Sequence, residues 1–375
     1  MKALLLSAYA AQSHVHWQRC LLSIFPEWQW EVLSLPPRHF SWRVRGNPLY
    51  WSLTERERLE QDYDLLIATS MTDLATLRGL VPSLSRPPSL LYFHENQFDY
   101  PQQSKQSSLL EAQMVSLYSA LAADRLAFNS RYNRDSFLAG VDALLRKLPD
   151  RVPPGICELL AQKAYVLPVP IEIDSGPVLA GDWPGLAGLY PDRPLRLLWS
   201  GRFEHDKGGD RLWHILAQLE RMELAYELAL TGQQFRNSPA VFARIEKTYS
   251  HRLVQFGYLP LERDYRALLH ASDVVLSTAQ HEFQGLAILE AVACGCVPVV
   301  PARQAYPEIY PPGCCYDSYP QDAVLEASAA AALICEIATE LGRGSSLTPD
   351  VSAFDISQLR VLYRQFMQEM TVSTA

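Results

Sequence analysis

Short runs of apolar residues alternate along almost the whole chain with longer segments in which apolar positions recur every three or four residues. The short runs predict strands that are buried on both faces, and the longer segments predict amphipathic helices. Such strands are typical of a parallel sheet, because its crossover helices cover both faces of the sheet. The pattern therefore predicts an α/β protein.

Both halves of the chain show this alternation. In the first half we expect strands at 4–6, 65–68, 89–93 and 125–128, and helices at 13–25, at 107–123 and from 131 onward. In the second half we expect strands at 195–200, 226–231, 253–256, 273–278 and 297–300, and helices from 211 to 222, from 285 to 295, at 323–341 and at 354–370. The two halves share a layout and predict two similar sheets.

Length and linker composition predict two domains. A chain of 375 residues exceeds what one hydrophobic core usually organises. The stretch 165–177 is rich in Pro and Gly and is predicted to be a linker. We therefore expect one domain over residues 1–170 and a second over residues 177–353.

Composition limits the compartment and the chemistry. No run of eighteen apolar residues occurs, and the apolar start of the chain is followed by polar residues rather than a cleavage site, so we expect a cytoplasmic protein without stable membrane association. Seven cysteines without a repeated C-x-x-C spacing predict neither a disulfide framework nor a zinc site. Asp62 and Asp64 have a metal-binding spacing, but they directly precede a buried strand, so we expect them to end a loop and predict no metal site.

The net charge of −8 argues against a protein that holds nucleic acid by bulk electrostatics. The charge is unevenly distributed, however. Residues 1–168 carry 17 basic and 16 acidic side chains, whereas the remainder carries 16 basic and 25 acidic ones. A polyanionic partner is therefore expected to bind the N-terminal half.

Polar residues follow two predicted strands of the first half. His94, Glu95 and Asn96 come directly after strand 89–93, and Ser13 and His14 lie in the first turn after strand 4–6. Ligands of open α/β sheets bind outside the carboxyl ends of the strands, so these residues are candidates for a binding site. Ser13 is equally well explained as the N-cap of the first helix.

Two cations and an aromatic residue hold similar positions in the second half. Arg202 and Lys207 lie in the loop after strand 195–200, and Tyr258 follows strand 253–256. Two cations at the carboxyl end of a strand suit a phosphate or diphosphate. The alternative is a surface loop with solvated charges.

The segment 281–296, HEFQGLAILEAVACGC, has the most specific pattern. A helix is expected to begin near Gly285, where free N–H groups and the positive end of the helix dipole provide an anion site. Glu282 and Glu290 are eight residues apart, about 12 Å along a helix, so they are placed to contact two ends of one extended ligand. The alternative is that Glu282 caps the helix and Glu290 is solvated.

The segment 36–51 combines three arginines with several aromatic residues and contains no acidic residue. Arg38, Arg43 and Arg45 offer phosphate contacts, and Trp42 offers a stacking surface for an unpaired base. The segment therefore predicts a nucleic-acid contact. A loop whose aromatics pack on the domain and whose arginines face water explains the pattern equally well.

The acidic segment 281–296 resembles the corresponding motif of retaining nucleotide-sugar glycosyltransferases with the GT-B fold, in which two facing Rossmann-like domains hold the donor in the cleft between them. The resemblance implies that Glu282 lies beside the donor sugar and that Glu290 binds the ribose. It further implies that Arg202 and Lys207 bind the donor phosphates, assisted by the start of the helix at Gly285. The terminal helix, about 354–371, is expected to cross back to the first domain.

Together with YFHENQ at 92–97, GRFEHDKGGD at 201–210, YPEIYP at 306–311 and the basic aromatic segment, the motif resembles the tRNA-queuosine α-mannosyltransferase family. This implies transfer of mannose from GDP-mannose to the cyclopentenediol of queuosine in tRNA(Asp), with retention and without a metal or cofactor. The implied catalytic residues are His94, Arg202, Lys207 and Glu282; the donor-binding residues also include Tyr258, Phe283, Gly285, Leu286 and Glu290; the acceptor-binding residues are Ser13, His14, Arg38, Trp42, Arg43, Arg45, Glu95 and Asn96.

Two other functions are compatible with the sequence. One is a nucleotide-sugar-dependent hexosyltransferase that acts on another modified tRNA, a glycan or a lipid. The other is a non-catalytic protein that binds a nucleotide-sugar or RNA. The sequence gives no oligomeric state.

Overall fold

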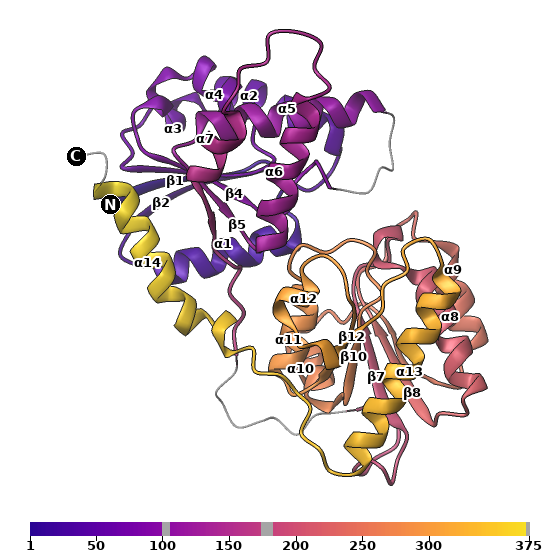
Figure 1. Cartoon of the computed structure of the whole chain (residues 1–375). Helices are drawn as coiled ribbons and strands as arrows, with labels where there is room; N and C mark the ends of the chain where they lie inside the picture. Colours follow the sequence, from indigo (N-terminus) through magenta and orange to yellow (C-terminus); the bar gives the residue numbers. More distant parts are fainter. Residues whose placement is uncertain (100–105, 174–182, 373–375) are drawn as a thin grey trace. The chain divides into compact units, whose positions relative to one another are not determined.

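The computed structural model describes residues 1–99, 106–173 and 183–372 (Figure 1). Contacts divide the chain into two units, the first formed by Met1–Pro170 with Ile356–Ala375 and the second by Ile171–Asp355. Each unit contains a six-stranded parallel sheet with helices packed against it. The two units are described one at a time below.

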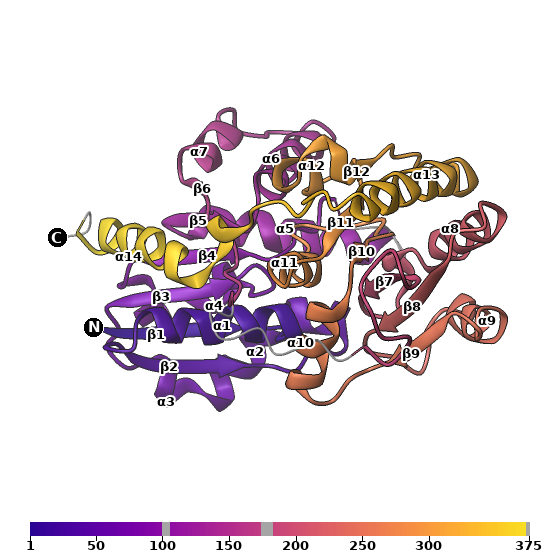
Figure 2. The ribbon, with the colours of Figure 1, turned by 90° about the horizontal axis from the view of Figure 1, so that it is seen from below.

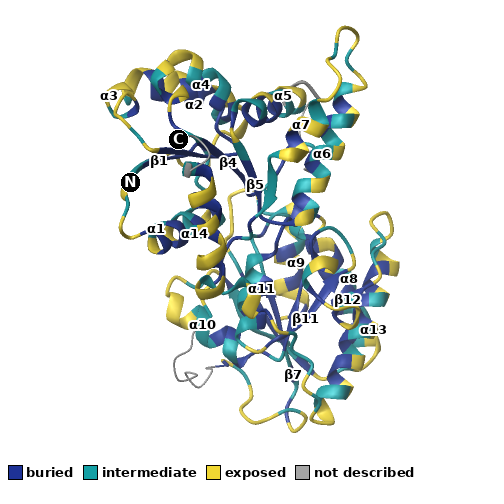
Figure 3. Ribbon diagram, turned by 60° about the vertical axis from the view of Figure 1, so that its left-hand side comes forward, coloured by how far each residue is buried: buried dark blue, intermediate teal, exposed yellow. Residues whose placement is uncertain are grey.

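The sheet of the first unit has the strand order β2-β1-β3-β4-β5-β6 (Figure 2). Its strands β3 and β4 are buried along their whole length, and β1 is buried from Ala3 onward, as their continuous apolar runs predicted (Figure 3). The strands are β1 Lys2–Ser7, β2 Gln29–Ser34, β3 Leu65–Thr69, β4 Ser89–Phe93, β5 Arg125–Phe128 and β6 Ala164–Val166; the helices are α1 Gln12–Ile24, α2 Phe40–Thr54, α3 Arg56–Leu59, α4 Leu74–Leu80, α5 Gln106–Ala122, α6 Arg131–Leu145, α7 Ile156–Gln162 and α14 Ile356–Val372, with a 3₁₀ turn at Pro82–Ser85.

Side-chain caps define where two of these helices begin. The Asp73 carboxylate accepts a hydrogen bond from the Thr76 N–H at 3.1 Å at the start of α4. The Ser130 hydroxyl accepts one from the Asn133 N–H at 3.0 Å at the start of α6. Helix α1 begins one residue before Ser13 and has Ala11 as its N-cap, so the interpretation of Ser13 as a cap is wrong.

From Phe40 onward the basic aromatic segment forms helix α2, so the interpretation of 36–51 as a loop holds only for residues 36–39. Pro48 lies inside the helix and has no N–H to donate to the Val44 carbonyl. The Asn47 side-chain amide replaces this donor, because its Nδ2 lies 3.0 Å from the Val44 carbonyl oxygen. Pro48 and Gly46 are unfavourable inside helices, so the sequence pattern does not indicate a helix here. Val44, Asn47 and Trp51 are nevertheless buried at helical spacing.

The terminal helix α14 belongs to the first unit and packs beside α1. Tyr363 joins it to α1 and to the segment after β6, since its hydroxyl accepts a hydrogen bond from Trp17 Nε1 at 2.9 Å and donates to the Pro168 carbonyl at 3.0 Å. At the surface, Arg364 forms an ion pair with Glu27 at 2.8 Å. These contacts attach the last helix to the N-terminal part of the chain.

The second unit has the strand order β12-β11-β10-β7-β8-β9. Successive residues of β7 enter opposite cores: Trp199 packs with α8 and α13, and Leu198 packs with α10 and α11. The strands are β7 Leu195–Ser200, β8 Tyr226–Thr231, β9 Leu253–Gly257, β10 Val274–Leu276, β11 Val297–Pro301 and β12 Cys315–Tyr316; the helices are α8 Gly209–Arg221, α9 Ala240–Thr248, α10 Glu262–Ala271, α11 Leu286–Ala293, α12 Tyr306–Ile309 and α13 Ala323–Gly342, with 3₁₀ turns at His205–Lys207, Pro312–Cys314 and Ser352–Phe354.

The predicted linker 165–177 is partly wrong. Tyr165 and Val166 belong to strand β6 and pair with β5. Ile171 already belongs to the second unit, where its N–H donates to the Phe354 carbonyl at 2.9 Å. The rest of the predicted linker, from 174 to 177, lies outside the described residues.

Candidate active site

Three charged side chains of the second unit lie close together at the carboxyl edge of its sheet. Lys207, in the loop after β7, places its Nζ 2.9 Å from the Glu282 carboxylate, which follows β10. The same ammonium lies 3.5 Å from Asp206. Arg202 lies 4.0 Å from Asp206 and 3.0 Å from Glu204. The structure thus brings Arg202, Lys207 and Glu282 together.

The backbone that carries Lys207 is held against the loop after β10. Gly208 has a φ of 70°, and a Cβ there would lie 2.0 Å from the Thr278 carbonyl oxygen. The Thr278 hydroxyl donates to the Lys207 carbonyl at 2.7 Å and accepts from Trp199 Nε1 at 2.9 Å. Glycine is therefore needed at position 208 for the two loops to approach each other.

Helix α11 starts beside these charges. Its N-cap is Gly285, with a φ of 80°, where a Cβ would lie 2.9 Å from the Tyr306 ring. The N–H groups of Ile288 and Leu289 donate to the Gly285 carbonyl, each at 3.0 Å. Those of Leu286 and Ala287, at the very start of the helix, have no partner within it, and the positive end of the dipole lies there. Phe283, just before the helix, is buried edge-on to His281. The turn combines cations with free N–H groups, an arrangement that suits a diphosphate.

Glu290 contacts a neighbouring helix. The Tyr265 hydroxyl of α10 donates to the Glu290 carboxylate at 3.4 Å and lies 3.1 Å from the Ser200 hydroxyl. Burial, followed by the charge of Glu290, raises the pKa of Tyr265 above its ordinary value, so this hydroxyl remains a donor. Neither Tyr265 nor Ser200 was predicted from the sequence; the position of Ser200 at the end of a strand is the one signal that pointed to it.

Electrostatics keep Lys207 charged. Burial by itself lowers its pKa, but the carboxylates of Glu282 and Asp206 outweigh burial and raise the pKa above its ordinary value. A protonated ammonium on a half-buried side chain interacts more strongly with an anion than one in bulk water does. Lys207 is therefore well placed to bind a phosphate.

A buried ion cluster that was not predicted from the sequence supports the loop that carries Glu282. The fully buried Glu326 carboxylate accepts from Arg211 at 2.6 Å and from Arg303 at 2.6 Å. Arg303 also donates to the Ala279 carbonyl at 3.1 Å. The next residue, Gln304, accepts from the Glu282 N–H at 2.6 Å. The cluster thus connects α8 and α13 to the loop after β10.

In the first unit, the predicted residues His14, His94 and Glu95 lie together. The two imidazole rings are stacked with centroids 4.0 Å apart, and His14 Nε2 lies 3.2 Å from the Glu95 carboxylate. His94 is buried, and in the part of the chain that the structure describes neither of its ring nitrogens has a hydrogen-bond partner. Burial, followed by the neighbouring His14 and His16, holds the pKa of His94 well below its ordinary value. His94 is therefore a neutral side chain with unused hydrogen-bonding capacity.

Lowering the pH is expected to destabilise the first unit through His94. An unfolded histidine has a pKa of about 6.5, so below this pH the unfolded chain binds a proton that the folded chain does not. The free energy of unfolding should then fall by up to about 1.4 kcal/mol per pH unit for this one group, until the pH reaches the folded pKa. Urea unfolding at several pH values should show a smaller decline in His94→Gln. Equal declines in both proteins would rule out His94 as the source.

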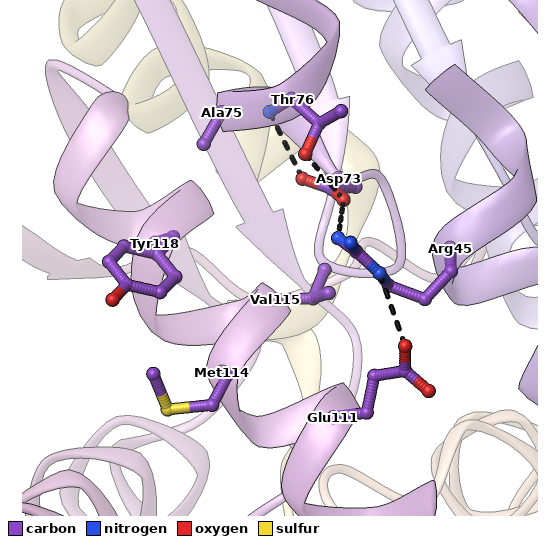
Figure 4. Close-up of a pocket in the computed structure, with 8 residues that line it drawn as sticks. All are labelled: Arg45, Asp73, Ala75, Thr76, Glu111, Met114, Val115 and Tyr118. Carbon is purple, nitrogen blue, oxygen red and sulfur yellow. Dashed lines mark hydrogen bonds and ion pairs between the residues drawn. The ribbon is translucent and has the colours of Figure 1, made fainter. Parts of the chain in front are cut away.

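The remaining acceptor candidates differ in their surroundings. Asn96 is buried and donates to Asn133 and Ser136, so it holds its own loop in place. Arg45 pairs with Asp73 at 2.5 Å and Glu111 at 3.3 Å (Figure 4). These carboxylates, with Ala75, Thr76, Met114, Val115 and Tyr118, line a pocket of about 450 Å³ between α2, α4 and α5.

Other predicted residues lie at the surface. Trp42 and Arg38 are exposed, and Ser13 and Arg43 are half-buried. In the second unit, Tyr258 is 58% exposed just after Gly257. The contacts of these residues with donor or acceptor stay predictions.

Within residues 1–99, 106–173 and 183–372, no group of three or more His, Cys, Asp or Glu side chains is arranged to hold a metal ion. Asp64 of the D-x-D segment accepts a hydrogen bond from the Lys2 N–H at 2.7 Å. Metal independence stays a prediction.

Within the same described ranges, no helix is long and apolar enough to cross a bilayer.

Solved structures show the fold, and a family model shows the class of enzyme. Sucrose-phosphate synthase from Thermosynechococcus elongatus is similar with a TM-score of 0.70, at 15% identity and 100% coverage of both chains. Anabaena HepE in complex with UDP is similar with a TM-score of 0.62, at 17% identity and with coverage of 98% of this chain and 100% of that one. A family model for group 1 glycosyl transferases matches residues 188–333. The chain is thus a glycosyltransferase with the GT-B fold, which confirms the predicted fold class.

The family can be stated more narrowly: the chain belongs to the tRNA-queuosine alpha-mannosyltransferase family. The model of that family's N-terminal domain matches residues 2–171. The tRNA-queuosine alpha-mannosyltransferase of Drosophila melanogaster is 35% identical over 283 residues, which are 75% of this chain and 74% of that protein. A GDP-mannose-dependent alpha-(1-6)-phosphatidylinositol dimannoside mannosyltransferase of Mycobacterium tuberculosis matches a shorter part of the chain. It is 31% identical over 130 residues, which are 34% of this chain and 33% of that protein.

Proposed function

We propose that this enzyme transfers mannose from GDP-mannose to the cyclopentenediol of queuosine in tRNA(Asp), with retention at the anomeric carbon. The name of the Drosophila relative supports the sugar and the acceptor, and the name of the mycobacterial relative supports the donor. The observation that carries the proposal is the arrangement of Arg202, Lys207 and Glu282 next to the start of α11. It provides cations, N–H groups and a carboxylate in one place.

The donor is held by its diphosphate in this proposal. Negative charge grows on the diphosphate as the glycosidic bond breaks, and Lys207, Arg202 and the first N–H groups of α11 stabilise that charge. Because these groups are already in place, little reorganisation is needed during the reaction. This stabilisation of the leaving group is the main contribution of the second unit to catalysis.

Carboxylates on either side of the diphosphate bind the rest of the donor. Glu282, which lies 2.9 Å from Lys207, accepts hydrogen bonds from hydroxyls of the sugar. Glu290 accepts from the ribose hydroxyls, and its contact with Tyr265 orients the carboxylate. Lys207 and Glu282 therefore contact adjacent parts of one ligand.

Retention follows from attack on the same face as the departing diphosphate. A donor phosphate oxygen takes the proton of the attacking queuosine hydroxyl, so no protein side chain is needed as nucleophile. Neutral His94 contributes a hydrogen bond to the transferred sugar. The acceptor RNA binds the first unit, because residues 1–168 form the less acidic half of the chain.

Donor identity is tested by thermal unfolding with different sugar nucleotides. GDP-mannose at about 100 times its Kd should add about 2.7 kcal/mol to the stability of the second unit, a rise of about 5–10 °C in its melting temperature. GDP should give a smaller rise, and UDP-glucose at the same concentration should give little. A larger rise with UDP-glucose than with GDP-mannose would contradict the proposed donor.

A further inference from the structure

Helix α2 presents an aromatic and basic surface, which we call the α2 face. It consists of Trp42, Leu49, Tyr50 and Leu53, which are exposed, together with Arg38 just before the helix and Arg43 in its first turn. We propose that the α2 face binds single-stranded RNA next to the acceptor nucleoside, with Trp42 as a stacking platform for one base. The proposal rests on the proposed function, which makes RNA the acceptor.

Trp42 is held in place by the helix it belongs to. A Cβ at Gly46, one turn later, would lie 2.5 Å from Cε2 and 2.7 Å from Cζ2 of the Trp42 indole. The indole therefore rests on the helix backbone at Gly46, where only a glycine leaves room for it. The side chain is nevertheless 58% exposed. A large aromatic ring that is supported by backbone and open to solvent is preorganised for stacking on a base.

Charge complementarity favours a polyanionic partner. Residues 36–54 contain no acidic side chain, in a protein whose net charge is −8. Within the described residues neither Arg38 nor Arg43 forms an ion pair, and Arg43 Nε is buried without a hydrogen-bond partner. Arg45, by contrast, is neutralised by Asp73 and Glu111. Arg38 and Arg43 are thus the cations of the α2 face that are available to phosphates.

The α2 face is attached to the carboxyl edge of the first unit's sheet. At the start of the helix, the Phe40 ring packs edge-on against Tyr9, which follows β1. In the middle of the helix, Asn47 Nδ2 donates to the Met71 carbonyl, in the loop after β3. That loop also contacts the residues after β4, since the Ser70 hydroxyl donates to the Glu95 carbonyl at 3.2 Å. RNA bound along the α2 face is therefore adjacent to the edge that carries the His14, His94 and Glu95 group.

RNA binding measured directly tests the proposal. The dissociation constant of a fluorescent anticodon stem-loop should increase about 5- to 150-fold in Trp42→Ala, because one base no longer has its stacking partner. Trp42→Phe should retain most of the affinity. Gly46→Ala should weaken binding in the same direction as Trp42→Ala, since the added methyl displaces the indole while the helix is kept.

Arg38→Glu combined with Arg43→Glu should weaken binding and make it less sensitive to salt. The slope of log affinity against log salt concentration should become shallower by about 0.7 for each phosphate that the arginines no longer neutralise.

Matched controls lie at the opposite, amino edge of the same sheet. Trp28 is half-buried just before β2, and Arg86 is exposed just before β4. Trp28→Ala and Arg86→Glu should leave the affinity for RNA unchanged.

The outcomes separate this inference from the proposed function. If Trp42→Ala and Gly46→Ala bind the stem-loop as tightly as the wild type, the α2 face is not an RNA site. If Trp42→Ala instead changes the oligomeric state and leaves RNA affinity unchanged, the face binds a second copy of the chain and the proposal is wrong. If RNA binding depends on Trp42 but the wild-type enzyme transfers no sugar to the RNA, the α2 face is supported as an RNA site and the proposed reaction is overturned.

Discussion

Lys207→Ala is expected to lower the turnover number for sugar transfer by about 100- to 1,000-fold, because a preorganised cation is removed from the position where negative charge develops. Arg202→Ala should lower it as well. Single-turnover transfer with saturating donor separates this effect from weaker donor binding. Lys207 is half-buried between the Glu282 and Asp206 carboxylates, so it contributes more than a solvated lysine would.

The controls distinguish a catalytic effect from unfolding. Lys247 is exposed on α9 of the same unit, and Lys247→Ala should transfer sugar at the wild-type rate. Lys207→Ala removes the cation beside Glu282 and leaves Asp206 with Arg202 alone, so its unfolding should be measured in parallel with transfer. Near-normal turnover in both Lys207→Ala and Arg202→Ala would contradict the assignment of these cations to the diphosphate.

Glu326→Ala is expected to destabilise the second unit by about 3–5 kcal/mol. The substitution leaves two buried or nearly buried guanidinium groups, Arg211 and Arg303, without the carboxylate between them. It should also free Arg303 from its position beside the Ala279 carbonyl, and so loosen the loop that carries Glu282. Donor binding should weaken for this reason, although Glu326 itself contacts no donor in the proposal.

Denaturant unfolding of the purified variants measures this effect. Glu336 is an exposed residue of the same helix, α13, and Glu336→Ala should change the free energy of unfolding by less than about 0.5 kcal/mol. Glu326→Gln keeps the shape and some hydrogen bonds, so its destabilisation should be intermediate. A Glu326→Ala protein with wild-type stability would show that the ion cluster does not hold this unit together.

The local features of the site were predictable because they depend on short stretches of sequence. Gly285 marked the start of α11, and the strand before Arg202 and Lys207 placed both cations at the carboxyl edge. The α/β class followed from alternating strands and helices, and the GT-B fold was implied by the resemblance of segment 281–296 to retaining nucleotide-sugar glycosyltransferases. Each of these signals lies within about one strand, turn and helix.

The features that escaped prediction depend on residues far apart in sequence. Glu326 lies more than a hundred residues from Arg211, and Tyr265 reaches Glu290 from another helix. The stack of His14 on His94 joins two different strand ends. Helix α2 was missed for another reason, because Pro48 breaks the expected pattern and Asn47 compensates for it locally.

Transfer of labelled mannose to defined tRNA tests the central claim most directly. Wild-type enzyme with GDP-mannose is predicted to label tRNA(Asp) that contains queuosine, to leave the same tRNA without queuosine unlabelled, and to lose this activity in Lys207→Ala. Absence of label from the queuosine-containing tRNA, or equal labelling of both tRNAs, would contradict the account.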